Sequence, residues 1–245
     1  MFRLQLKDNV RLEDFKGYTV IIPSICIGNA AQLACDLLIS SKNLKRVASI
    51  SHPALIPCYG PSAFQHEPEE KIAACELYSC PDSKLLVFQF RSPFISTHMT
   101  SFHKELANTL TNAGKVIVLS GSLGFEKRII DSCPYEYKAS ESFKGIHGDR
   151  LQNMKWKEFG GEMIFGGGNA LDLYKIMDEQ NVPVMILFRY LLEGDNSTDA
   201  ALILSELSEL CKDFLALNTD VGGLQLKVPI SWKLLFGNDI PELIF

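Results

Sequence analysis

The sequence lacks an excess of positive charge. It has 24 Lys and Arg residues against 29 Asp and Glu residues, and a net charge of −5. A face that binds nucleic acid neutralises phosphates with clustered Lys and Arg side chains, and no stretch of this sequence gathers them. We therefore expect no nucleic-acid partner, and an acidic membrane surface is disfavoured for the same reason.

The sequence also lacks a long apolar run. Its longest one, from Val182 to Leu192, is interrupted by Arg189 and is shorter than the roughly 20 residues that span a bilayer. The stretch from Met1 to Gly17 mixes charged residues with isolated apolar ones, unlike a secretory signal. The sequence predicts no attachment to a membrane.

Cysteine pairs at metal-binding spacing are missing as well. The seven cysteines are scattered, and none forms a Cys-x-x-Cys pair. Neither a zinc site nor a disulfide framework is indicated. We expect reduced, mostly buried thiols in a cytoplasmic or nuclear protein that binds no metal ion and no cofactor.

Strand-like and helix-like segments alternate along the chain, which predicts an α/β fold. The run Val116–Leu119 has no polar alternation and is typical of a central strand covered on both faces. Apolar residues from Ala30 to Leu38 follow the spacing of one buried helix face. We predict strands over residues 18–22, 46–50, 73–78, 85–90, 116–119 and 184–190, and helices over 30–38, 102–113 and 199–217, with another beginning at Asn169.

From about residue 121 to 165 the periodicity is lost, because small, polar and aromatic residues mix without pattern. We predict a long surface insertion here, with one short helix around Trp156. No linker rich in proline or glycine divides the chain. A single domain over residues 1–245 is expected, with a C-terminal tail at about 238–245.

Two motifs suggest an alternative function. Ser120-Gly-Ser-Leu-Gly124 follows a predicted strand and approaches a nucleophile elbow. However, His147 comes only 25 residues after Ser122 (147 − 122), which leaves little chain for an acid-bearing strand. Gly166-Gly-Gly-Asn169 could cradle a phosphate ahead of a helix, but it lacks the spacing of known phosphate motifs. The alternative is therefore a small-molecule hydrolase or a nucleoside-phosphorylase-like enzyme that uses Ser122 or the Gly166 loop.

The C-terminal residues are unusually apolar. Trp232, Leu235 and Phe236 lie in one aromatic and aliphatic stretch, and Leu243, Ile244 and Phe245 come last. Free termini are usually polar. Such a tripeptide either folds back onto the core or enters a pocket of a partner, and the composition leaves both options open.

Several of these blocks together resemble the proteasome assembly chaperone 2 family. They occur in the same order as in that family over most of the chain, and the similarity is weakest between about residues 122 and 160. The matching blocks are Ile25-Cys-Ile-Gly-Asn29 with Gln32-Leu-Ala34 and Asp36-Leu37, then Phe90-Arg-Ser92, Glu193-Gly-Asp-Asn196 and Pro229-x-Ser-Trp-x-Leu-Leu-Phe-Gly237.

The resemblance implies a three-layer α/β/α sandwich with a mostly parallel central sheet and no catalytic site. It also implies a heterodimer with proteasome assembly chaperone 1. That heterodimer would bind the α-subunit ring of the proteasome 20S core particle, promote its correct assembly and prevent off-pathway association.

The resemblance also assigns roles to the C-terminal residues. Tails in this system end in a hydrophobic residue, a tyrosine and any residue. Leu243 matches the first position, whereas Ile244 stands where the tyrosine would be. We predict a proteasome-binding tail at Leu243, Ile244 and Phe245. We also predict a partner surface in the stretch that contains Trp232, Leu235 and Phe236.

Overall fold

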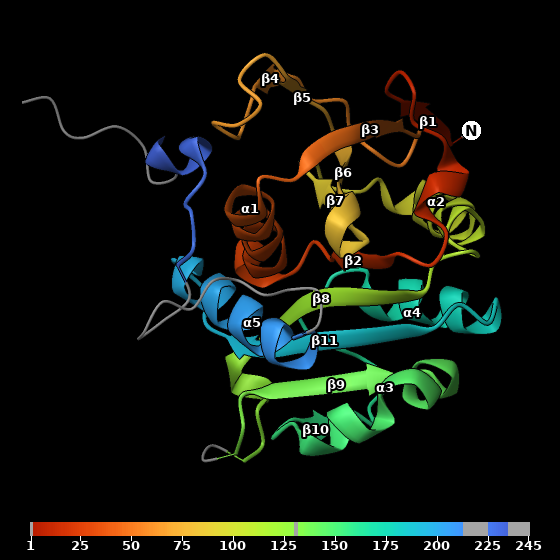
Figure 1. Cartoon of the computed structure of the whole chain (residues 1–245). Coiled ribbons are helices and arrows are strands. Elements are labelled where there is room, and N and C mark those ends of the chain that lie inside the picture. The colour runs from red at the N-terminus through yellow and green to blue at the C-terminus, as the bar shows by residue number, and fades with distance from the viewer. Residues whose placement is uncertain (1, 130–131, 213–224, 235–245) are drawn as a thin grey trace, which may run out of the picture.

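A mixed nine-stranded sheet forms the centre of the computed structural model, which describes residues 2–129, 132–212 and 225–234 (Figure 1). The strand order is β1-β3-β6-β7-β2-β8-β11-β9-β10. The strands are β1 (Arg3–Leu6), β2 (Thr19–Pro23), β3 (Lys45–Ser51), β6 (Cys75–Cys80), β7 (Leu85–Phe90), β8 (Lys115–Leu123), β9 (Tyr135–Ala139), β10 (Lys157–Glu158) and β11 (Val184–Leu191).

The four central strands, β7, β2, β8 and β11, are parallel to one another. β2 and β7 are buried along their whole length, and β8 is buried except at its two ends, as expected for strands covered on both faces. Antiparallel strands flank this parallel core, with β6, β3 and β1 on one side and β9 on the other. The prediction of an α/β fold with a mostly parallel central sheet is confirmed.

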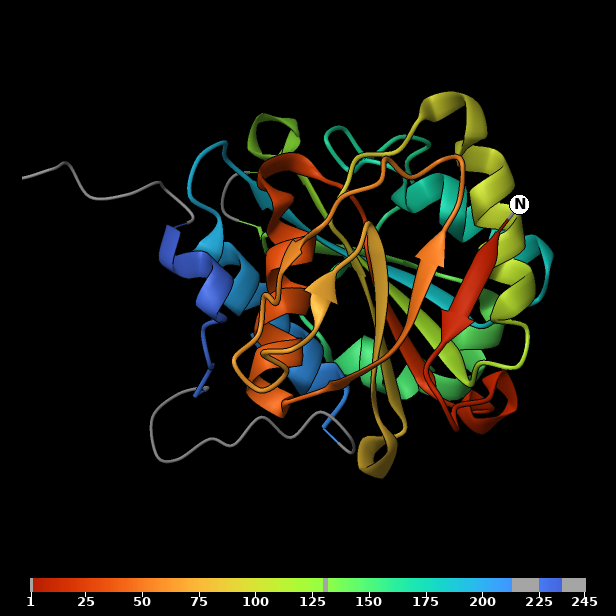
Figure 2. The ribbon, with the colours of Figure 1, turned by 90° about the horizontal axis from the view of Figure 1, so that it is seen from above.

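Helices cover both faces of the sheet (Figure 2). On one face α1 (Ala30–Lys42) lies beside α5 (Ser197–Leu210), and on the other α2 (Ser96–Thr109) lies beside α4 (Ala170–Glu179). Successive strand residues point to opposite faces. Accordingly, Ile21 and Ile117 pack with α1 and α5, whereas Val20 and Val118 pack with α2 and α4. The three-layer arrangement matches the expectation.

The structure of residues 121–165 differs from the predicted surface insertion. They contain the end of β8, strand β9, helix α3 (Glu141–Asn153) and edge strand β10. β9 pairs with β11 in the sheet, and Phe143 of α3 is fully buried. The predicted helix around Trp156 is also wrong, because α3 ends before it. Trp156 is instead a buried side chain that donates a hydrogen bond to Glu206 of α5 at 2.6 Å.

Two segments lie outside the central sheet. Residues 52–70 are mostly irregular and hold one strand of a small hairpin, formed by β4 (Gly60–Pro61) with β5 (Lys71–Ile72). The tail at 238–245, together with Leu235 and Phe236, lies outside the described residues. In the parts of the chain that are described, no helix is both long and apolar enough to cross a membrane.

Candidate functional site

The carboxyl ends of the parallel strands bring together the residues of both enzyme-like motifs. Ligands of open α/β sheets usually bind at this edge. Ser24 follows β2, Ser120 lies near the end of β8, and the Gly166 loop packs against them. The Ser24 hydroxyl donates a hydrogen bond to Ser120 Oγ at 2.9 Å, and the Ser120 hydroxyl donates to the carbonyl of Gly167 at 3.0 Å. The hydroxyls of this edge are thus bonded to one another and to backbone.

Ser122 is not arranged as a nucleophile. Its hydroxyl donates to the carbonyl of Phe165 at 3.1 Å, and the residue is only 3% exposed. His147 lies on α3, where its Nε2 is 2.6 Å from Lys115 Nζ. An activated serine needs a base within hydrogen-bond reach, and within the described ranges no histidine contacts Ser122. This geometry does not form the predicted alternative site.

Glycines at the carboxyl ends of the parallel strands allow chain segments to approach each other closely. A Cβ atom at Gly168, where φ is +59°, would lie 2.1 Å from the carbonyl oxygen of Ile25. At Gly28, φ is +60° and a Cβ atom would lie 1.8 Å from Oδ1 of Asn196. Only glycine tolerates both the backbone conformation and the contact. The Gly166 loop therefore packs against its own chain, and two blocks that carried the family resemblance touch at Gly28 and Asn196.

Hydrogen bonds of His103 and Asn169 connect α2, the start of α4 and the segment that follows β2. Asn169 directly precedes α4, as predicted, but its side chain makes no hydrogen bond that caps the helix. The side-chain amide instead donates to Nε2 of His103 on α2 at 2.9 Å, and its oxygen accepts a hydrogen bond from the Ile25 N–H at 3.3 Å. His103 is fully buried, and burial lowers its pKa to about 4, although Asp172 opposes the shift.

The buried His103 should make stability depend on pH. Between pH 6.5 and 4 the unfolded chain binds a proton at this histidine and the folded chain does not, so stability falls as pH falls through this window. From pH 7 to 5 we expect a loss of about 2 kcal/mol in the free energy of unfolding, measured by urea denaturation. His103→Gln should flatten this slope, whereas His98→Gln, at an exposed position, should keep it. An unchanged slope in His103→Gln would contradict the assignment.

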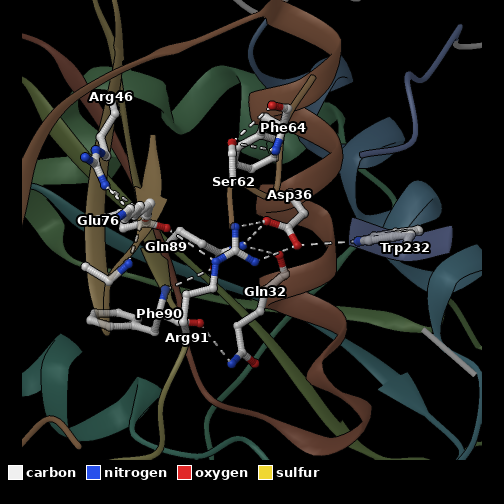
Figure 3. Close-up of polar contacts among 12 residues, drawn as sticks. Gln32, Asp36, Arg46, Ser62, Phe64, Glu76, Gln89, Phe90, Arg91 and Trp232 are labelled. Carbon is white, nitrogen blue, oxygen red and sulfur yellow. Dashed lines mark hydrogen bonds and ion pairs between the residues drawn. The ribbon is translucent and has the colours of Figure 1, made fainter. Parts of the chain in front are cut away.

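A buried network of charges lies where β3, β6 and β7 meet α1 (Figure 3). Arg91, directly after β7, binds Asp36 of α1 through two nitrogens, at 2.7 and 2.9 Å. Its Nε is 3.4 Å from Glu76 of β6, which also pairs with Arg46 of β3 at 3.3 Å. Burial raises the pKa of Glu76, although the two arginines oppose the shift. Gln89 adds a hydrogen bond to Asp36 at 2.6 Å.

The C-terminal segment 225–234 is fastened to this network and to α1. Trp232 is half-buried against the core, and its indole N–H donates to Asp36 Oδ2 at 3.4 Å (Figure 3). The N–H of Ser231 donates to the carbonyl of Ala63 at 3.3 Å, and that of Lys227 donates to Ser41 Oγ at 2.9 Å. Trp232, predicted as a partner surface, thus contacts its own chain. We call residues 225–234 the C-terminal anchor.

No sequence motif pointed to this network. A signal was nevertheless present, since Asp36 interrupts the apolar run from Leu33 to Ile39 in α1 and Gln89 interrupts the apolar run of β7. A buried polar side chain needs partners, which here come from distant parts of the chain. No group of His, Cys, Asp and Glu residues in the described part of the chain could hold a metal ion.

Comparisons with known proteins agree on one family. The sequence model described as the PAC2 family matches residues 20–224. The chain is 32% identical to proteasome assembly chaperone 2 of Danio rerio, over 94% of this chain and 96% of that protein. It is 28% identical to proteasome assembly chaperone 2 of Homo sapiens, over 95% and 96%.

A solved structure shows the same fold at much lower identity. The crystal structure of Pyrococcus furiosus PbaA, an archaeal homologue of proteasome-assembly chaperone, superposes with a TM-score of 0.68. The match covers 90% of this chain and 88% of that one, at 16% sequence identity. At this identity the likeness shows the fold alone.

Proposed function

Because the chain belongs to the PAC2 family of non-enzymatic chaperones, we propose that it assists proteasome assembly as one subunit of a heterodimer. Its partner is proteasome assembly chaperone 1. The pair binds the α-subunit ring, promotes its correct assembly and prevents off-pathway association, in the cytoplasm and nucleus. The observation that carries this proposal is the similarity to proteasome assembly chaperone 2 over nearly the whole length of both proteins.

The geometry at the carboxyl ends of the parallel strands supports a non-enzymatic role. A hydrolase that used Ser122 would need a base beside its hydroxyl, and that hydroxyl donates to the Phe165 carbonyl instead. A phosphorylase that used the Gly166 loop would need free backbone N–H groups facing a ligand. The loop instead packs against Ile25 and Leu123. Neither form of the alternative enzyme is favoured.

The C-terminal anchor supports a docking role for the residues that follow it. Leu243, Ile244 and Phe245 form the proposed tail for a pocket of the α ring. The anchor holds Trp232 on α1, and the 13 residues from there to Phe245 (245 − 232) reach at most roughly 45 Å when fully extended. Trp232, which is only half-buried, remains a proposed partner surface with Leu235 and Phe236. The exposed side chains of Val228 and Ile230 extend it.

Affinity purification tests the proposal. We expect the tagged chain, expressed in cells, to co-elute with proteasome α subunits and with proteasome assembly chaperone 1 at one-to-one stoichiometry. Ser122→Ala is the control: it should co-elute equally, because it removes only a hydrogen bond worth about 1 kcal/mol to stability. Elution without either partner would contradict the proposal. Loss of partners on Ser122→Ala, with the fold intact, would revive the enzyme alternative.

A further inference from the structure

Four large apolar side chains are exposed at the carboxyl ends of β8 and β11. Phe125, just past β8, and Leu192, just past β11, are each 76% exposed. Met163 and Phe165, which lead into the Gly166 loop, are 62% and 47% exposed. Single exposed apolar residues are normal on protein surfaces, but a group of them on adjoining segments marks an interaction site.

The three segments that carry these side chains adjoin one another. The N–H of Leu123 donates to the carbonyl of Phe165 at 2.9 Å, which joins the end of β8 to the Gly166 loop. A Cβ atom at Gly124 would lie 3.1 Å from Cδ2 of Leu192, so that side chain lies directly beside the turn that carries Phe125. We call Phe125, Met163, Phe165 and Leu192 the carboxyl-end patch.

The area of the patch indicates the kind of partner. At these exposures the four side chains present about 400–500 Å² of apolar surface, if each offers roughly 170 Å² in full. A stable interface buries about 800 Å² on each partner, with an apolar core and a polar rim. The patch has the size of such a core. The exposed charges of Arg128, Glu193 and Asp195 adjoin it in sequence and fit the rim.

We propose that the carboxyl-end patch is the surface that binds the second PAC2-fold subunit of the heterodimer. This inference rests on the proposed function and names a contact between the two subunits in addition to the partner surface proposed at Leu235 and Phe236. Permanent interfaces are more apolar than transient ones, so this patch suits a lasting partner better than a ring that is later released. The acidic side chains of Glu193 and Asp195 disfavour an anionic lipid surface as the occupant.

The test compares two double variants, each co-expressed with proteasome assembly chaperone 1. Phe125→Ser with Leu192→Ser removes the centre of the patch. Tyr59→Ser with Ile146→Ser changes two side chains of similar exposure, 81% and 53%, elsewhere on the surface. Binding is measured by titration, and melting temperature reports whether each variant folds.

We expect the patch variant to bind chaperone 1 roughly a hundredfold more weakly, because truncating central apolar anchors has the largest effect on an interface. The control variant should bind as the wild type does. If the patch variant binds chaperone 1 as tightly as the wild type does, the surface assignment is overturned and the proposed function stays intact. A wild-type chain that ignores chaperone 1 and forms a homodimer through these residues overturns both.

Discussion

Replacing Arg91 by alanine should lower the free energy of unfolding by about 3–5 kcal/mol, since it leaves the buried carboxylate of Asp36 without its cation and that of Glu76 with Arg46 alone. The side chain of Glu76 is 1% exposed and that of Asp36 is 7% exposed, so water does not replace the lost partner. Arg91 also packs over the ring of Phe64, which joins the 52–70 segment to the network. Urea denaturation at pH 7 measures the loss.

The matched control is Arg11→Ala. Arg11 pairs with Asp14 at 3.1 Å, but its side chain is 75% exposed, and exposed pairs contribute little. We expect a change within about 0.5 kcal/mol. The loss of stability in Arg91→Lys should fall between those of the two alanine variants, because lysine keeps the charge but cannot bind Asp36 through two nitrogens. A loss below about 1 kcal/mol in Arg91→Ala would mean that the network does not stabilise the fold.

The parallel core could be predicted from the sequence because its strands are buried on both faces. That burial requires uninterrupted apolar runs, and the stretches around Val118 and Leu187 display them directly. The added strand β9 gave no such signal, since only its end residues, Tyr135 and Ala139, are buried. Helix α3 buries only Phe143 and Leu151, too few for a helical period to stand out.

The charge network could not be predicted because its members are far apart in sequence. Asp36, Glu76 and Arg91 meet only when α1, β6 and β7 pack together, and no local spacing encodes that meeting. The position of Trp232 on α1 has the same origin. Sequence motifs likewise suggested a nucleophile at Ser122, but the geometry of the folded chain decides which hydrogen bonds that hydroxyl makes.

The proposed tail should govern binding to the α ring. Burying two large apolar side chains contributes roughly 3–6 kcal/mol before ordering costs, and fixing several residues removes a good part of that gain. Deleting Leu243 to Phe245 should therefore weaken ring binding about 10- to 100-fold. Melting temperature and binding to chaperone 1 should stay unchanged, because the anchor contacts of Trp232 and Lys227 lie before the deletion.

Two further variants separate docking from packing onto the chain's own core. In a protein expressed with Phe245 last, adding two residues moves the terminal carboxylate, which should weaken ring binding if a lysine of the pocket pairs with it. Ile244→Tyr should strengthen binding, because a tyrosine hydroxyl gains a hydrogen bond at the wet end of an apolar pocket. If the tripeptide packs on its own core instead, the deletion lowers the melting temperature and the extension has little effect on ring binding. Unchanged or weaker binding by Ile244→Tyr would mean that this tail does not dock as the family pattern implies.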